Sequence, residues 1–127
     1  MIEILSAKKF QVKLKATIQS SGRLGFTEDT AKVLHLESGT PMKFARDNEQ
    51  DALYLARLQE KDEDSFEVKK SGEYFYLDTR SLFNTLGIDY RANSVIFDFA
   101  RAASLDELMG GEAYKLCKRV KQRNGKE

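Results

Sequence analysis

Apolar and polar side chains alternate along residues 10–18. Every second residue from Phe10 onward is apolar, and Lys13 and Lys15 are among the polar residues between them. A period of two predicts a strand with one buried face and one polar, basic face. Residues 20–22 predict a turn and residues 23–26 a short return strand. The pattern therefore begins with a hairpin that carries lysines on its outer side.

A short helix is predicted after this hairpin. Thr27 is a good N-cap residue, and the acidic pair Glu28 and Asp29 favours the first turn of a helix. The rest of the pattern predicts strands over residues 40–45, 52–58, 66–70, 74–77, 94–100 and 113–120, a second helix capped by Asp78, and one helical turn within residues 102–112.

The same order of elements occurs twice along the chain. Ser71-Gly72 follows Ser21-Gly22 by about 50 residues, and the helix ends align at a similar spacing. Two such copies can complete one shared core, although two runs of this kind can also resemble each other by chance. The expected organisation is a first repeat at residues 1–60, a second at 61–120 and a basic tail at 121–127.

Composition and charge narrow the function classes. Apolar residues make up 41% and charged residues 32% of the 127, which is typical of a globular chain. No apolar run approaches the roughly 18 residues of a membrane span, and the start lacks a signal-peptide pattern, so a cytoplasmic protein without membrane contact is expected. The net charge of +1 hides basic ends, at residues 1–24 and 115–127, around an acidic middle. Basic ends suggest contact with a polyanion, or else a solvated tail and ordinary strand-edge lysines.

Catalytic chemistry finds little support in the chain. It has one histidine, His35, and one cysteine, Cys117, which excludes an intrachain disulfide and any mechanism that needs two histidines. We expect no enzymatic activity, no cofactor and no metal. Tyr74 and Tyr76 would share one face of a strand, where they could stack unpaired bases or cover a neighbouring strand. The acidic stretch at residues 47–51 is interpreted as a solvated hairpin loop.

Several motifs together resemble a known family. Residues 13–27 combine a basic strand, a Gly-Arg turn at Gly22-Arg23 and an apolar strand, and a short helix ending near Leu34 and Leu36 follows. Residues 13–58 thereby resemble the swapped-hairpin module of the AbrB/SpoVT family of transcription factors and antitoxins. Residues 66–118 resemble it less closely, through Gly72 and the Leu86-Gly87-Ile88 sequence. The remaining matches in the first copy are Gly25, Ala31, Gly39, Met42, Phe44 and Leu53-Tyr54-Leu55.

This chain also departs from the family pattern. Thr27 and Asp78 stand near the positions where most members have a proline before the helix. Glu73 stands where the first copy has Arg23. The second copy is therefore expected to keep the fold and to lose the ligand contact.

The resemblance implies a mainly β fold with short helices, in which two pseudo-repeats form one interleaved, AbrB-like swapped-hairpin barrel. The tandem layout is similar to that of MraZ proteins, so the chain would be a monomeric pseudo-dimer or a homodimer. It also implies a transcriptional regulator or antitoxin-like protein that contacts duplex DNA through Lys13, Lys15, Arg23 and Arg46. The alternative is a protein-interaction or assembly module with the same fold and no DNA binding, which the acidic middle and Glu73 favour.

Overall fold

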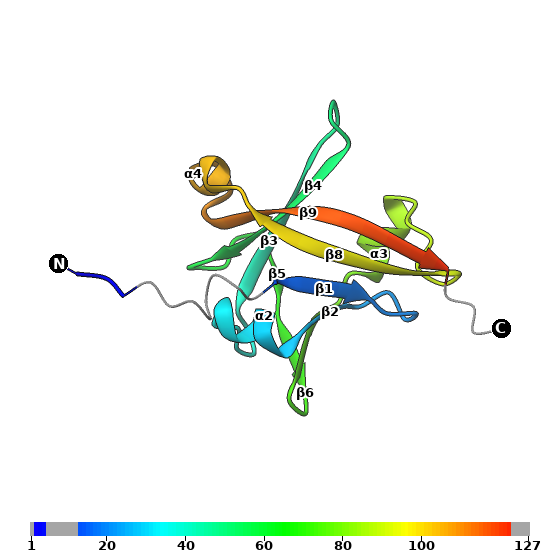
Figure 1. Ribbon diagram of the computed structural model, residues 1–127, viewed down its shortest axis with the longest axis horizontal. Helices are drawn as coiled ribbons and strands as arrows, with labels where there is room; N and C mark the ends of the chain where they lie inside the picture. The colour runs from blue at the N-terminus through cyan, green and yellow to red at the C-terminus, as the bar shows by residue number, and fades with distance from the viewer. Residues whose placement is uncertain (1, 5–12, 123–127) are drawn as a thin grey trace.

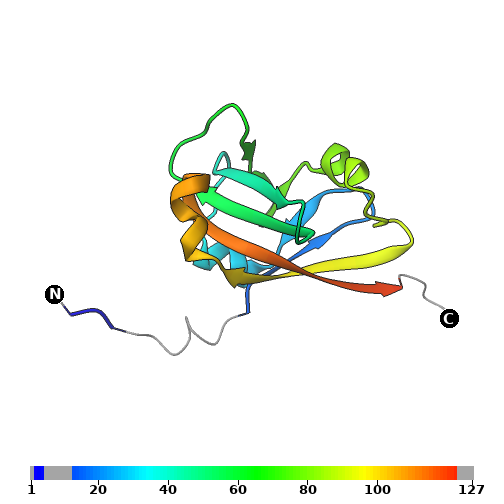
Figure 2. The ribbon, with the colours of Figure 1, turned by 90° about the horizontal axis from the view of Figure 1, so that it is seen from above.

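Antiparallel strands form one continuous sheet that curls into a nearly closed barrel, with short helices on its outside (Figures 1 and 2). The computed structural model describes residues 2–4 and 13–122, so the predicted strand residues 10–12 lie outside the described part. The mainly β character and the short helices predicted from the sequence are confirmed. In these residues the strands are β1 (Lys15–Ile18), β2 (Leu24–Phe26), β3 (Pro41–Asp47), β4 (Ala52–Leu58), β5 (Phe66–Glu67), β6 (Lys69–Ser71), β7 (Tyr74–Leu77), β8 (Asn93–Arg101) and β9 (Gly111–Gln122), and the helices are α2 (Glu28–Val33), α3 (Arg80–Thr85), the 3₁₀ turn η1 (Ala103–Leu105) and α4 (Asp106–Met109).

The strand order explains how the barrel closes. The sheet runs β5-β3-β4-β9-β8-β1-β2-β7-β6, so the consecutive strands β5 and β6 lie at its two ends. Val68, between them, donates its N–H to Thr40 O at 2.8 Å, and its carbonyl accepts the N–H of Gly39 at 2.7 Å. The single strand predicted at residues 66–70 is therefore divided at the buried Val68. Before this residue the chain pairs with β3, and after it the chain pairs with β7.

The two main helices begin in different ways. Thr27 caps α2 as predicted, since its Oγ1 accepts the N–H of Thr30 at 3.2 Å. The predicted cap of α3 by Asp78 is wrong. The N-cap residue is the buried Thr79, whose hydroxyl donates to Gly22 O at 2.8 Å instead of capping its own helix. The start of α3 is thus fixed to the turn of the first hairpin.

One apolar core joins both halves of the chain. Phe83 of α3 is fully buried, and its ring centroid lies 6.1 Å from those of Phe44 on β3 and Phe97 on β8. Ala16 and Leu116, near opposite ends of the described chain, belong to the same cluster. A smaller cluster lies under α4 on the other side of the sheet and includes Ala56, Leu58, Met109 and Ala113.

Strand β9 extends further than the sequence predicts. It is paired with β8 as far as Gln122, opposite Asn93. Lys121 and Gln122 are therefore strand residues, although they were expected to begin a basic tail. None of the helices in the described ranges is long and apolar enough to cross a membrane.

Candidate nucleic-acid interface

Cationic side chains line the outer side of three neighbouring strands. In the antiparallel register Lys15 of β1 lies opposite Asp98 of β8, which lies opposite Cys117 of β9. Because directly paired residues share a face and alternate residues repeat it, β1 and β9 project their odd-numbered residues to the same side. We call the charged set there the basic outer face: Lys13, Lys15, Asp98, Lys115, Arg119 and Lys121.

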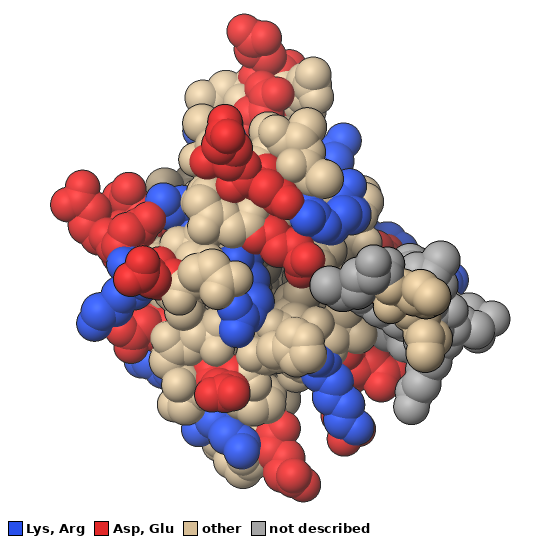
Figure 3. Space-filling model, turned by 90° about the vertical axis from the view of Figure 1, so that its left-hand side faces the viewer, with Lys and Arg blue, Asp and Glu red and all other residues tan. Residues whose placement is uncertain are grey.

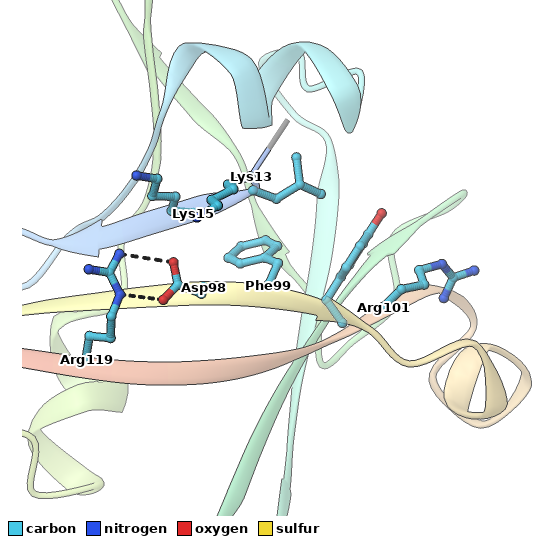
Figure 4. A pocket seen from close by; sticks show the side chains of 8 residues that line it. Lys13, Lys15, Asp98, Phe99, Arg101 and Arg119 are labelled. Atoms are coloured by element: carbon cyan, nitrogen blue, oxygen red, sulfur yellow. Dashed lines mark hydrogen bonds and ion pairs between the residues drawn. The ribbon is translucent and has the colours of Figure 1, made fainter. Parts of the chain in front are cut away.

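A pocket of about 730 Å³ lies at one end of this face. Figure 4 shows Lys15 of β1 and Lys13, two residues before β1, on one side of it, while Asp98 of β8 and Arg119 of β9 meet on the other. Phe99 lines the pocket between them. The arrangement offers cations above an aromatic surface, which suits a negatively charged ligand.

Asp98 is the one carboxylate of the basic outer face, and it is neutralised locally. Arg119 donates hydrogen bonds from Nε and Nη2 to the two oxygens of Asp98, with an Nη2–Oδ1 distance of 3.0 Å. The hydrogen bond from Arg119 lowers the pKa of Asp98, and the positive charges of Arg119, Lys15 and Lys13 act in the same direction. Asp98 therefore neutralises about one positive charge, that of Arg119. Within the described residues it forms no ion pair with the lysines of the face.

Arg101 lines the same pocket but is held by other groups. Its guanidinium donates to both oxygens of Asp106, at 2.7 and 2.6 Å, and to Ala113 O at 3.0 Å. Asp106 also accepts the N–H of Ala113 at 2.9 Å. The hydrogen bonds from Arg101 and from Ala113 lower the pKa of Asp106 to about 2, and the one from Arg101 has the larger effect. Arg101 thus fixes η1 and α4 to the start of β9.

Replacing Asp106 with asparagine should remove an acid-sensitive part of the stability. The folded pKa of about 2 lies below the ordinary value of 3.8, so ionised Asp106 stabilises the fold above about pH 4. That contribution is lost as the pH falls towards 2. Asp106→Asn should lower the urea midpoint at about pH 7 and flatten its decline between about pH 4 and pH 2. Glu107→Gln, on the same helix, is the control. Parallel pH profiles for wild type and Asp106→Asn would contradict this.

A second group on the outer side of the sheet surrounds Arg23. The guanidinium carbon of Arg23 lies 4.4 Å from the ring centroid of Tyr76 on β7. Tyr74 is nearly parallel to Tyr76, with 5.9 Å between centroids and 19° between planes. The Tyr74 hydroxyl lies over Gly25 of β2 and accepts a hydrogen bond from the side-chain amide of Gln19. Burial raises the pKa of Tyr74. Tyr74 thus covers the neighbouring strand β2. This is one of the two roles that the sequence suggested for Tyr74 and Tyr76.

The structure does not bring Arg46 to this surface. Arg46 is paired with Leu53 near the end of the β3–β4 hairpin, and it lines another pocket together with Lys118 and Leu86. Lys13 and Lys15 lie together, whereas Arg23 lies further along the same side of the sheet. Of the four residues expected to contact DNA, three therefore share the outer side of one sheet, and the contribution of Arg46 stays a prediction.

Sequence reasoning did not place the β9 residues of the basic outer face beside the first hairpin. Lys115, Arg119 and Lys121 were interpreted as part of a basic tail that would add non-specific affinity for phosphates. Their spacing at alternate positions is the signal that they share a strand face. Only the pairing of β8 with both β1 and β9 shows that this face adjoins the lysines of β1.

Acidic side chains gather elsewhere on the molecule. Figure 3 shows acidic side chains at the top of the face, at its left margin and lower down, and Figure 1 places the β3–β4 hairpin at the top, projecting away from β1. Asp47 starts the loop of this hairpin by accepting the N–H groups of Glu49 and Gln50 at 3.0 and 3.4 Å. The loop is thus the exposed hairpin connection expected from residues 47–51.

Other candidate chemistry remains isolated. Cys117 is exposed on β9, and His35 follows α2 with a positive φ of 53°. Within residues 2–4 and 13–122, no three His, Cys, Asp or Glu side chains are grouped so that they could hold a metal ion. No protein-family model, curated protein or solved structure matches this chain.

Proposed function

We propose that this chain is a non-enzymatic DNA-binding protein that contacts duplex DNA through the basic outer face. The observation that carries the proposal is the shared face of β1, β8 and β9, where lysines and Arg119 outnumber a single, already paired carboxylate. Phosphate contacts of this kind supply most of the affinity in non-specific DNA binding. A transcriptional regulator or antitoxin-like role is the corresponding biological function.

The spacing of the cations supports a duplex as the ligand. β1 and β9 are both neighbours of β8, so their rows of lysines lie two strand spacings apart, or about 10 Å. This separation is comparable with the width of the major groove, about 12 Å. The two rows can therefore contact phosphates of both backbones, while Asp98 lies between them.

The strand order supports two degenerate AbrB-like repeats as part of this proposal. If β5 and β6 are counted as one strand, the two halves of the chain correspond as β1 to β6, β2 to β7, β3 to β8 and β4 to β9. When each strand is replaced by its counterpart, the set of neighbouring strand pairs in the sheet stays the same. In the β4–β9 and β2–β7 pairs, each strand lies beside its own counterpart. Corresponding positions also share their conformation, because His35 and Gly87 both follow a helix with positive φ, at 53° and 74°. One chain would then supply both halves of a swapped-hairpin barrel.

The salt dependence of binding tests the proposed interface. For the full chain and a mixed-sequence duplex, log Kd should change steeply between about 50 and about 200 mM salt. Lys15→Ala and Lys115→Ala should each reduce the slope by about 0.9, since each removes one phosphate contact. The measurement is fluorescence anisotropy. Lys61→Ala is the matched control, because Lys61 lies in the loop before β5, with its Nζ 3.8 Å from Glu67. Equal slopes for all three variants would contradict the assignment.

A protein-interaction module without DNA binding is the second candidate. The observation in its favour is Leu108, which is 81% exposed on α4. It lines a groove with Tyr54, Leu105 and Met109. Under this alternative Leu108→Asp would remove a partner contact, whereas the substitutions in the basic outer face would have no effect.

A further inference from the structure

We propose that Arg23, held by Tyr76, is a pre-oriented reader of guanine edges in the DNA major groove. The inference rests on the proposed function and adds a base-reading element to it. Tyr76 belongs to the second half of the chain, so the two halves would combine in one reading device. Arg23 would touch the base, and Tyr76 would be a positioning residue.

The cation–π contact leaves hydrogen-bond donors of Arg23 available. The guanidinium carbon lies 4.4 Å from the Tyr76 ring centroid, and a guanidinium has five N–H donors, of which a ring face can take only a part. Arg23 is exposed, and in the part of the chain that the structure describes its side chain has no ion pair or hydrogen bond. Its fork therefore faces solvent with its donors unused. Guanine presents two acceptors, O6 and N7, in the spacing that this fork matches.

The surroundings of Tyr76 fix the ring on which Arg23 rests. Tyr76 pairs with Gly25 on one side and with Lys69 on the other. Tyr74 lies nearly parallel to it and occupies the space above Gly25, where an added Cβ would stand 1.5 Å from the Tyr74 hydroxyl oxygen. Gln19 donates a hydrogen bond to the same hydroxyl. Glycine at position 25 thus makes room for the tyrosine pair that supports Arg23.

The place of Arg23 in the turn suits a base contact better than a phosphate contact. It lies at the end of the β1–β2 hairpin, and its carbonyl accepts the N–H of Gln19 at 2.8 Å. Lys15 is four residues from Gln19 along the chain, or about 13 Å. If the lysines of the basic outer face hold the backbones, the tip of this hairpin lies beyond them. There the guanidinium fork of Arg23 can meet base edges.

Replacing guanine N7 in the probe tests this inference without changing the phosphates. The probes are a duplex of G·C pairs in mixed order and the same duplex with 7-deazaguanine at every guanine, each titrated by anisotropy. Wild type should bind the unmodified duplex about 5-fold or more tightly. Arg23→Lys and Tyr76→Leu should each reduce that preference, because lysine lacks the planar fork and leucine no longer positions it, and both should keep the salt slope because they retain the charge at position 23. Tyr76→Phe keeps the aromatic face and should retain the preference.

The outcomes separate this inference from the proposed function. Salt-dependent binding by wild type with equal affinity for both probes would overturn guanine reading and leave duplex binding intact. A preference that survives in Tyr76→Leu would overturn the positioning role. Thermal unfolding of each variant checks its fold, and Arg23→Lys, at an exposed position, tests the reading role if Tyr76→Leu does not fold. No binding of either duplex by wild type would overturn both proposals.

Discussion

Replacing Lys15, Lys115 and Lys121 together with glutamate should weaken duplex binding by about 100-fold or more at low salt. Each substitution removes one phosphate contact and places a negative charge on the basic outer face. These lysines have no ion pair within the described ranges, and the exposed Lys115 and Lys121 should tolerate the change within about 0.5 kcal/mol per site. Glutamate at position 15 would stand directly opposite Asp98, so this substitution should cost more. The measurement is Kd by fluorescence anisotropy, accompanied by thermal unfolding.

A second triple variant separates location from net charge. Lys32, Lys61 and Lys70 lie on α2, in the loop before β5 and on β6, and none belongs to the basic outer face; Lys32 and Lys70 line a different pocket. Replacing these three with glutamate changes the net charge by the same amount. Measured at about 0.1 M salt, where attraction between charges falls off within about 10 Å, this variant should keep most of the duplex affinity, because its three lysines make none of the proposed phosphate contacts. Equal losses in the two triple variants would show that net charge alone governs binding.

Phe83→Ala should lower the free energy of unfolding by about 3–5 kcal/mol, which is a large part of the stability of a typical small protein. The ring is fully buried between Phe44 and Phe97, so its removal leaves a cavity at the point where α3, β3 and β8 meet. Urea unfolding followed by circular dichroism and by tyrosine fluorescence measures the change.

The same experiment tests whether the two halves share one core. Residues of both halves belong to one buried cluster, so the two signals should report one transition, and Phe83→Ala should shift both equally. Phe75→Ala is the control, since Phe75 is only partly buried and should cost less. Two separate transitions, of which Phe83→Ala moves only one, would contradict a shared core.

Local patterns predicted the first hairpin and its helix well, and long-range contacts account for most of the differences. Thr27 caps α2 through Thr30, three residues away, and such a bond can be inferred from spacing. Thr79 instead donates to Gly22, 57 residues distant, and nothing in the neighbourhood of Asp78 predicts that contact. The division of residues 66–70 has the same origin, because barrel closure decides which strands they join.

The candidate site was predictable only in part for the same reason. Lys13 and Lys15 follow from alternation within one strand. Their proximity to Arg119 depends on β8 lying between β1 and β9, and strand order across about 100 residues is not visible in local periodicity. Likewise, Tyr76 supports Arg23 because β7 pairs with β2. Arg46 was selected by resemblance, and the topology places it on a different part of the barrel.

Binding of duplex DNA by the full chain is the most direct test of the central claim. Anisotropy titrations with a mixed-sequence duplex and a single strand of the same length, at low and moderate salt, are sufficient. The full chain is required, because truncation near Leu116 would remove half of β9. The lost residues include the β9 partners of all four β8 residues that pair with β1. We predict duplex binding in the micromolar range that weakens steeply as salt rises. Absence of duplex binding at low salt would contradict it.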